Sequence, residues 1–459
     1  MSKRSQAVHT PPAPSHADKL FAPLEARRAQ GRSRRDTVKR TSQADWKPSH
    51  GRPNPVAELL SANKDRHQEL LPIKWGRMDA SPFGFFRGAA PLMAMDLGML
   101  PATGLEVQMC GDAHILNLGA YASPDGHLVF DINDFDETLR GPWEWDVKRL
   151  ATSLVLAGRG SGESKSGGMD AVRAFVESYR AALKVFSEMK VVDLARWEIR
   201  PRTGNDSVRT VFEKAERTDA GVLLKKLTVP DKSKMPRFHD LEPVLSHVPE
   251  ATAKAVLASL KMYRDGLGVD YRHFLDAYRP VDVAFKLVGT GSVGTLDYVV
   301  LMLGNGPDDA LFLQIKEEVP SCYAPYLPAH RAVTHEGQRV ANGQRRIQTV
   351  SDPFLGWTTV NGEDYLVRQL SDHKASVDVT KLEGRILTEY GVLCGELLAK
   401  AHARTGDAAA ISGYCGDSTR LDRAIAKFAV AYADQTERDY SALRQAIKVG
   451  KLKTHNLGA

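Results

Sequence analysis

Cysteine is scarce in this chain of 459 residues. Only four are present, Cys110, Cys322, Cys394 and Cys415, and no two of them form a CxxC pair. This argues against a disulfide framework and against a structural zinc site, and it is typical of a protein in the reducing cytoplasm. Long apolar runs are missing too, since no stretch approaches the roughly 18 uninterrupted apolar residues of a membrane span. The N-terminal residues also lack the apolar region of a signal peptide, so we expect a cytoplasmic protein without a membrane span.

Excess charge is absent from most of the chain. The formal net charge is +6, but residues 1–50 alone hold 11 Lys and Arg against 4 Asp and Glu, which leaves the remainder close to neutral. A short segment rich in Pro, Ser and Arg is typical of a largely disordered tail, although ARRAQGRSRRDTVKR within it could become helical on contact with the body of the protein. A basic run without a base-reading motif is poor evidence of nucleic-acid binding.

The rest of the chain divides by its residue pattern. Helical spacing predominates in residues 51–280, beginning with a helix predicted for Pro55–Leu71. Residues 281–372 are rich in β-branched residues and glycine turns, which predicts a meander of three strands, a helical segment, and two more strands joined by the turn Asn361–Gly362. Residues 373–459 return to helical spacing, with a strong helix at Leu382–Arg404. We expect an α+β fold in which a small β-rich lobe is inserted into a mainly helical lobe.

The stretch Val107–Thr138 (VQMCGDAHILNLGAYASPDGHLVFDINDFDET) concentrates the polar residues with the most obvious chemistry. Acids, amides and a histidine follow apolar runs that resemble strands, at Asp112, His114, Asn117, Asp131, Asn133, Asp134 and Asp136. Oxygen-rich clusters of this kind build sites for Mg²⁺ and phosphate. An EF-hand loop is disfavoured, because the glycine required at its sixth position is replaced by Asp136.

A glycine motif lies far downstream, Gly289-Thr290-Gly291-Ser292-Val293-Gly294. A dinucleotide-binding turn would open a helix, but these glycines lead into LDYVVLML, which has the pattern of a strand. The motif therefore favours a hairpin that covers nucleotide phosphates, with a plain glycine hairpin as the alternative.

Two cations stand in unusual surroundings. Lys316 follows an apolar strand, where it could neutralise phosphates if an acid holds it, and Glu336 in the next helical segment is the candidate acid. Arg87 lies among the aromatic residues of SPFGFFRGAA, so it should have an acidic or phosphate partner; a structural ion pair is the simpler explanation.

These motifs resemble known families. CGDAHILN followed by INDFDE resembles the catalytic loop and metal-binding turn of the aminoglycoside-phosphotransferase branch of the protein-kinase-like enzymes. Longer stretches (SPFGFFRGAA, CGDAHILNLG, FDINDFDET, GPWEWDVKRLA, FLGW) resemble the bacterial domain-of-unknown-function family 2252, from about Gly31 to the C-terminal helices. Two departures are evident. The catalytic loop precedes the glycine loop, which implies a circular permutation, and Cys110 stands where the phosphotransferases have histidine.

The resemblance implies a permuted, two-lobed, kinase-like fold and an ATP- and Mg²⁺-dependent phosphotransferase. It assigns the following expected roles: Asp112 is the catalytic base or orienting acid, with His114 nearby; Asn117 and Asp134 bind Mg²⁺; Lys316 and Glu336 position phosphates; Gly289, Thr290, Gly291, Ser292 and Gly294 cover the nucleotide; Asp146 braces the catalytic loop. Asp136 and Arg87 are expected to support the site, and Asp131 is an alternative metal ligand to Asp134.

Three other functions fit the same residues. A pseudoenzyme would bind nucleotide without transferring phosphate, a related enzyme would transfer AMP, and a phosphoesterase would use the acid-rich stretch alone. No pattern in the sequence identifies the acceptor or the oligomeric state.

Overall fold

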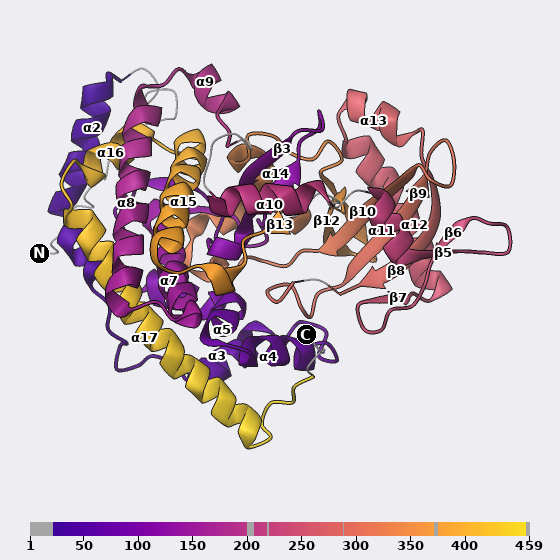
Figure 1. The fold of residues 1–459 in the computed structure, drawn as a ribbon, viewed down its shortest axis with the longest axis horizontal. Helices are drawn as coiled ribbons and strands as arrows, with labels where there is room; N and C mark the ends of the chain where they lie inside the picture. Colours follow the sequence, from indigo (N-terminus) through magenta and orange to yellow (C-terminus); the bar gives the residue numbers. More distant parts are fainter. Residues whose placement is uncertain (1–21, 200–205, 218–219, 288, 371–374, 456–459) are drawn as a thin grey trace, which may run out of the picture.

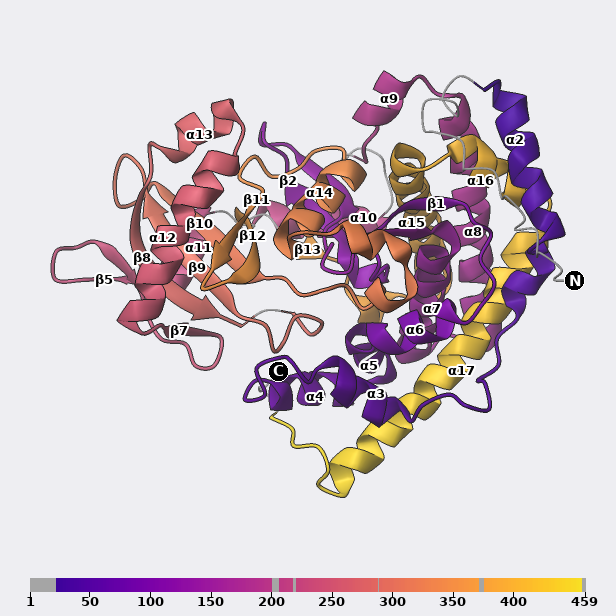
Figure 2. The same cartoon turned by 180° about the vertical axis from the view of Figure 1, so that it is seen from behind.

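The computed structural model describes residues 22–199, 206–217, 220–287, 289–370 and 375–455. It consists of a helical lobe and a smaller lobe built on a β-sheet, which lie side by side in both ribbon views (Figure 1, Figure 2). The fold is therefore α+β, as the sequence indicates.

The framework of the helical lobe combines helices from both ends of the chain (Figure 1): α2 (Leu24–Ser33), α7 (Trp143–Ser161), α8 (Lys165–Glu188), α15 (Gly384–Thr405), α16 (Ala408–Cys415) and α17 (Arg420–Lys448). Helix α7 lies at the centre, since every residue from Trp143 to Gly158 is buried. A helix enclosed on all sides has no face in contact with solvent. Its polar residues must therefore find hydrogen-bond or ionic partners inside the protein. Several of those partners belong to the candidate site.

Helices α8 and α15 cross at close range. A Cβ atom added at Gly395 would lie 2.4 Å from the carbonyl oxygen of Phe175, and one at Gly391 would lie 2.8 Å from that of Ala171. Both distances are too short for a real side chain. Glycine at these two positions therefore permits an interhelical contact that larger residues would force apart.

Short helices lead from the N-terminal region to the acid-rich stretch: α3 (Pro55–Ala62), α4 (Leu71–Asp79), α5 (Pro82–Gly88) and α6 (Ala90–Gly98). The helix predicted for Pro55–Leu71 is therefore too long, since α3 ends at Ala62 and residues 63–70 are not helical. Helix α3 ends early, because Asn63 donates its side-chain amide to the carbonyl of Leu59 in place of continuing the helix. Trp75 and Phe85 pack with Leu443 of α17, which fixes this segment to the C-terminal helix.

Two hairpins carry the acid-rich stretch. Strand β1 (Glu106–Met109) pairs antiparallel with β4 (Leu139–Pro142), and β2 (Leu118–Ala122) pairs with β3 (Leu128–Ile132). The short helix η3 (Ile115–Asn117) leads into β2, and β13 (Ala375–Ser376) adds a third strand beside β2. The loops at 110–114 and 133–138 therefore lie at neighbouring strand ends.

The smaller lobe contains an antiparallel sheet of six strands in the order β11-β12-β10-β9-β8-β7. Their bounds are β7 (Leu245–His247), β8 (Arg279–Lys286), β9 (Asp297–Leu303), β10 (Ala310–Glu317), β11 (Gly356–Val360) and β12 (Glu363–Gln369). The predicted three-strand meander is present as β8, β9 and β10. The predicted turn joins β11 to β12, with φ of +53° at Asn361 and +92° at Gly362, values that suit a tight hairpin turn.

Helices cover both faces of this sheet. Tyr263 of α12 (Glu250–Gly266) packs with Val300 on one face, and Leu224 of α11 (Ala220–Leu227) packs with Val299 on the other. Neighbouring strand residues point to opposite faces, so both sides of β9 are buried. The predicted lobe boundary at residue 281 is therefore wrong, because α11, α12 and β7 belong to the sheet lobe. Helical spacing alone cannot show which core a helix covers.

The expectation of a largely disordered N-terminal tail is wrong for its described part, whereas the helix considered possible within ARRAQGRSRRDTVKR is present in α2. Residues 22–50 contain α2 and the short helices η1 (Arg34–Asp36) and η2 (Arg40–Ala44), while residues 1–21 lie outside the described residues. Arg27 forms an ion pair with Asp407 at 2.7 Å, and Arg35 donates to the carbonyl of Tyr414 at the end of α16. The basic residues therefore hold this segment against the helical lobe.

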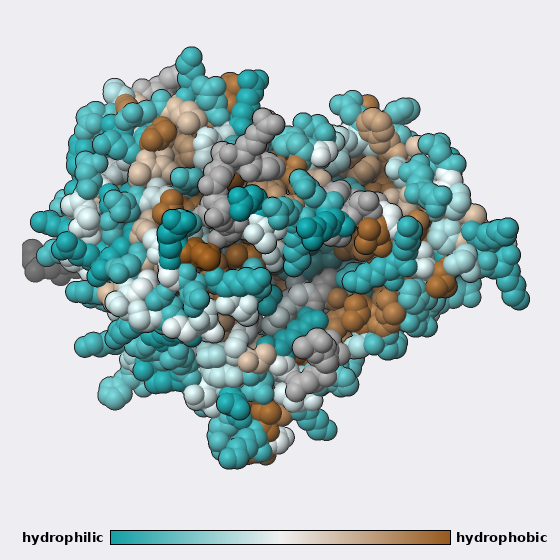
Figure 3. All heavy atoms as spheres, in the orientation of Figure 1, coloured by the Kyte–Doolittle hydropathy of each residue, from teal (hydrophilic) through white to brown (hydrophobic). Residues whose placement is uncertain are grey.

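The other elements are β5 (Thr228–Pro230), β6 (Pro236–Phe238), α9 (Val191–Arg196), α10 (Asp206–Glu216), α13 (Val269–Leu275), α14 (Glu336–Ile347), η5 (Ala324–Tyr326), η6 (Pro328–Ala332) and η7 (Val379–Lys381). Hydrophilic side chains cover most of the face drawn in Figure 3. Within the described residues, none of the helices has the length and apolar character that crossing a membrane requires.

Candidate active site

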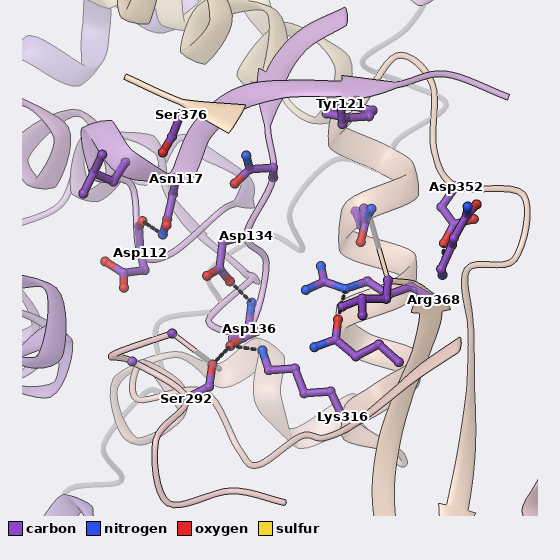
Figure 4. Close-up of a pocket in the computed structure, with 18 of the residues that line it drawn as sticks. Asp112, Asn117, Tyr121, Asp134, Asp136, Ser292, Lys316, Asp352, Arg368 and Ser376 are labelled. Carbon is purple, nitrogen blue, oxygen red and sulfur yellow. Dashed lines mark hydrogen bonds and ion pairs between the residues drawn. The ribbon is translucent and has the colours of Figure 1, made fainter. Parts of the chain in front are cut away.

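A cavity of about 1170 Å³ lies between the lobes. Its walls come from the acid-rich stretch of the helical lobe, from the glycine loop between β8 and β9, and from strands β10 and β12. The lining includes many of the residues singled out in the sequence: Arg87, Asp112, His114, Asn117, Asp134, Asp136, Gly289, Thr290, Gly291, Ser292 and Lys316. Residues more than 150 positions apart in the chain thus share one cavity (Figure 4).

Helix α7 holds the loop that follows β1. Gly111 has φ of +84°, and a Cβ atom there would lie 2.3 Å from the carbonyl oxygen of Glu137, so this position requires glycine. Asp146 in the first turn of α7 accepts hydrogen bonds from the backbone N–H groups of Cys110 at 2.9 Å and Gly111 at 3.0 Å. Asp146 therefore supports the loop, as expected, through two hydrogen bonds from the loop backbone.

Asp112 follows directly and is bound by Arg149, one helical turn beyond Asp146. The Nε of Arg149 donates to Oδ1 of Asp112 at 2.6 Å, and the Arg149 guanidinium is completely buried. Burial raises the pKa of Asp112, while the charge and hydrogen bond of Arg149 oppose that rise. This pairing stabilises the carboxylate and fixes its orientation.

His114 lies beside Asp112, with its Nε2 atom 3.8 Å from Oδ2 of that residue. Burial lowers the pKa of His114 far below its usual value, and the positive charges of Arg87 and Arg149 lower it further. The imidazole is therefore neutral near pH 7. Its Nδ1 atom is buried and has no hydrogen-bond partner among the described residues.

Asn117 and Asp134 supply oxygen atoms to the cavity. The Nδ2 of Asn117 donates to the backbone carbonyl of Asp112 at 2.9 Å, which leaves its Oδ1 as the atom suited to a metal ion. Asp134 accepts a hydrogen bond from the backbone N–H of Asp136 at 3.2 Å (Figure 4). No group of three or more His, Cys, Asp or Glu side chains forms a metal site in the described parts of the chain. One carboxylate and one amide fit Mg²⁺, which typically takes its other ligands from waters and substrate phosphates.

Asp131 is not placed for the metal-binding role considered as an alternative. It is buried on β3, forms an ion pair with Lys400 of α15, and does not line the cavity. Residues 131 and 134 are separated by the end of the strand, so they point to different parts of the protein. Asp131 joins the β2–β3 hairpin to α15.

Lys316 projects from the end of β10 into the cavity. Its Nζ atom contacts Oδ2 of Asp136 and lies 3.6 Å from Oε1 of Glu318. Burial disfavours both charges, but the attraction outweighs it: the pKa of Asp136 lies below its usual range and that of Lys316 above its own. Figure 4 shows Asp136 receiving both Lys316 and the Ser292 hydroxyl, which donates at 2.8 Å.

The predicted pair between Lys316 and Glu336 is wrong. Glu336 forms its ion pair with Arg339, one turn further along α14, and Arg339 also donates to the carbonyls of Asp136 and Thr138. The acid at the start of α14 therefore orients an arginine that holds the turn at 133–138. Glu318, two residues after Lys316, lies close to it. Residues two apart in a strand share a face, so the sequence could have predicted Glu318 as a neighbour of Lys316.

The glycine loop is fastened to the helical lobe. Arg66 donates to the carbonyls of Gly291 at 2.8 Å and Val293 at 2.9 Å, and Lys74 donates to Gly291 at 3.0 Å. Gly294 has φ of +99°, which suits glycine. Gly289, Thr290, Gly291 and Ser292 line the cavity, as expected for a loop that covers a ligand, whereas Gly294 does not.

Several residues that line or support the site were missed in the sequence. Arg149 could have been found, because it lies three positions after Asp146 and so shares a face of the same helix. Arg368 and Gln314 could not: they lie side by side on β12 and β10 and are joined by a 2.8 Å hydrogen bond, a contact set by strand register. Arg66 carried no pattern that distinguished it from other surface arginines.

A sequence model of the family described as "Uncharacterized protein conserved in bacteria (DUF2252)" matches residues 66–446. The chain therefore belongs to this family. Neither a curated protein nor a solved structure matches it.

Proposed function

We propose that this DUF2252 protein is an ATP- and Mg²⁺-dependent phosphotransferase with a circularly permuted, kinase-like arrangement. The observation that carries the proposal is the contact between Lys316 and Asp136. Lys316 belongs to the sheet lobe with the glycine loop, and Asp136 belongs to the turn that holds Asp134. Two half-sites, each incomplete alone, thus meet in one cavity.

The order of elements supports the permutation. Strands β8, β9 and β10 are followed by α14 and then by β11 and β12, which is the order of a kinase small lobe. Helix α15 comes next in the chain and packs beside the hairpin that follows the catalytic loop, through Lys400 and Asp131. The loop itself comes from the N-terminal half. Because packing and not chain order builds a site, this arrangement can place the same groups in the same cleft.

The chemistry would be in-line transfer of a phosphoryl group, with positioning and charge supplying most of the rate. Lys316 would neutralise nucleotide phosphates, and Asn117 and Asp134 would hold Mg²⁺, which neutralises the charge that develops during transfer. Asp112, oriented by Arg149, would align the acceptor hydroxyl and receive its proton as the new oxygen–phosphorus bond forms.

Calorimetric titration of ATP with and without Mg²⁺ tests the first step. We expect Mg²⁺-dependent binding that weakens at least about tenfold in Lys316→Ala, because a charge-assisted contact to phosphate is lost. Thermal unfolding of both proteins controls for loss of structure. Absence of Mg²⁺-dependent ATP binding in the folded wild-type protein would contradict the proposal.

A nucleotide-binding pseudoenzyme is the second candidate. The Arg149–Asp112 pair favours it, because Arg149 offsets part of the rise in the pKa of Asp112 that burial causes and so makes the carboxylate a weaker base than burial alone would. Release of phosphate or ADP from MgATP separates the two functions. A phosphotransferase should lose this slow turnover in Asp112→Asn while it keeps nucleotide affinity. A pseudoenzyme should show no turnover in either protein.

A further inference from the structure

We propose that Arg87 binds an anionic group, a phosphate or a carboxylate, on the acceptor. The proposed site lies in the part of the cavity between the glycine loop and Asp112. This inference rests on the proposed phosphotransferase function and names the chemical class of its acceptor. It begins from a half-buried cation that forms no ion pair within the described residues.

Arg87 is firmly placed. It lies in the last turn of α5, whose first turn is capped by Ser81, with the Gly84 N–H donating to the Ser81 hydroxyl at 2.9 Å. Its neighbour Phe86 is buried, and the Arg149 guanidinium stacks on the Phe86 ring at 4.3 Å and donates to its carbonyl at 3.2 Å. The same helix therefore positions Arg87 and supports the arginine that orients Asp112.

Four other buried cations around the site have acidic partners. Arg149 pairs with Asp112, Lys316 with Asp136, Lys400 with Asp131, and Arg339 with Glu336. Arg87 lines the cavity, yet it forms no ion pair within the described residues, and its buried Nε has no hydrogen-bond partner there. Removing an arginine from water without such a partner is costly, so an anionic ligand is the natural complement.

Two further arginines, Arg66 and Arg77, add positive charge to the surroundings of Arg87, whereas burial lowers the pKa of Lys74 far below its usual value. An added Cβ atom on Gly291 would lie 3.9 Å from the Arg87 carbonyl oxygen, so the glycine loop passes close to the end of α5. Arg66 and Lys74 both donate to the carbonyl of Gly291 and form no ion pair with any described acid. Arg77 also lines the cavity, near enough for the charge of Arg87 to lower its pKa.

Position favours the acceptor over the nucleotide as the source of the anion. Lys316, with Asn117 and Asp134 as metal ligands, already provides for the nucleotide phosphates from the sheet side. Arg87 comes from the helical lobe, where Asp112 and Asp134 are the acids that raise its pKa against the lowering effect of burial. An acceptor hydroxyl aligned by Asp112 would bring its anionic group to this guanidinium.

A guanidinium also indicates the geometry of the ligand. Arginine presents parallel N–H donors that match the two oxygens of a carboxylate or phosphate, whereas lysine offers a single charged point. A neutral sugar or amine would leave Arg87 unpaired and would add nothing to compensate its burial.

Calorimetric titration with inorganic phosphate tests the site in the full-length protein, first alone and then saturated with Mg²⁺ and a non-hydrolysable ATP analogue. We expect phosphate to bind in both states, about tenfold more weakly in Arg87→Gln and to an intermediate degree in Arg87→Lys, because a bidentate charged contact is lost or reduced. Arg140→Gln is the matched control. This arginine is half exposed on β4 beside Glu106 and lies outside the cavity lining, so its substitution should change nothing.

Each other outcome has a definite meaning. Equal phosphate affinity in wild type and both Arg87 variants would overturn the assignment. Loss of phosphate binding when the ATP analogue is present would overturn the acceptor as the source, since the γ-phosphate would then occupy the site. Arg87-dependent phosphate binding in a protein that binds no nucleotide would leave the anion site standing and reject the phosphotransferase function.

Discussion

Arg149 holds Asp112 through a single carboxylate oxygen: its Nε donates to Oδ1 at 2.6 Å, and its Nη2 lies 2.5 Å from the same atom. The other oxygen, Oδ2, is 3.8 Å from His114. The two oxygens therefore have different environments. Oδ1 anchors the side chain, and Oδ2 is the oxygen that would act on a substrate in the proposed phosphotransferase.

The pair should be strongly coupled in stability. Arg149→Met leaves a buried, unpaired carboxylate at Asp112, so it should lower the free energy of unfolding by about 3–5 kcal/mol. Adding Asp112→Asn removes that charge, and the double variant should be more stable than the sum of the single effects predicts. Urea unfolding of the four proteins measures the coupling. Strict additivity would show that the two side chains do not interact.

Glu336 should affect stability and leave nucleotide binding unchanged. Its ion-pair partner is Arg339, which donates to the carbonyls of Asp136 and Thr138, so Glu336→Gln removes support from the turn without uncovering Lys316. We expect a loss of about 1–3 kcal/mol in unfolding free energy, because a charge-assisted hydrogen bond is weakened. Affinity for MgATP should stay within about threefold of wild type, a change worth under 1 kcal/mol. A loss as large as that of Lys316→Ala would restore the pairing expected from the sequence.

Substitutions of Asp131 and Asp134 should have different effects: the first should lower stability, and the second should impair Mg²⁺ binding. Asp131→Asn leaves Lys400 buried without its counter-charge, so it should lower the unfolding free energy by about 3–5 kcal/mol. Asp134→Asn should preserve the melting temperature to within a few degrees and abolish the Mg²⁺ dependence of ATP binding. Melting curves and titrations of both variants decide the matter. Normal Mg²⁺ dependence in Asp134→Asn would remove this residue from the metal site.

Asp297 should make stability fall as pH rises. It is fully buried on β9, opposite Lys316 on β10, and burial raises its pKa to about 7 despite the nearby Lys316 and Lys286. The usual value is 3.8, so between these two pH values the folded protein binds more protons than the unfolded chain. The stabilising contribution is therefore complete below pH 3.8 and is lost progressively as pH rises through about 7.

Asp297→Asn removes this dependence and should keep the hydrogen bond that Gln314 donates at 2.6 Å. At pH 8 the variant should be more stable than wild type by about 1–4 kcal/mol, since each pKa unit corresponds to about 1.4 kcal/mol. At pH 5 the difference should fall to less than half of its value at pH 8, because only the interval between pH 3.8 and pH 5 then contributes. Melting temperatures of both proteins across this range provide the measurement, and a variant less stable than wild type at pH 8 would contradict the prediction.

The sequence predicted helices, strands and turns well where the residue pattern that defines them lies within one short segment. The β8–β10 meander, the Asn361–Gly362 turn and helix α15 each follow from spacing and turn residues within one segment. The boundary of the sheet lobe was missed, because the residues of α11 and α12 indicate a helix but not the sheet that it covers.

Partners across the site were the least predictable feature. Lys316 and Asp136 are separated by 180 positions, and no periodicity links them. Glu336 was the nearest acid in a helix and was the natural choice, but its side chain is held by Arg339. In contrast, Glu318 and Arg149 share a strand face or a helix face with a predicted residue, so their proximity was readable in principle.

The split of the helical lobe between the two ends of the chain bears on synthesis. The ribosome releases α7 and α8 early, but α15 and α17, which complete their core, emerge only after the entire sheet lobe. Because domains generally fold as units during translation, the second lobe to be made can finish folding first. The newly made N-terminal half would expose apolar surface throughout that interval, so the nascent chain presents a binding surface for chaperones that the finished protein conceals.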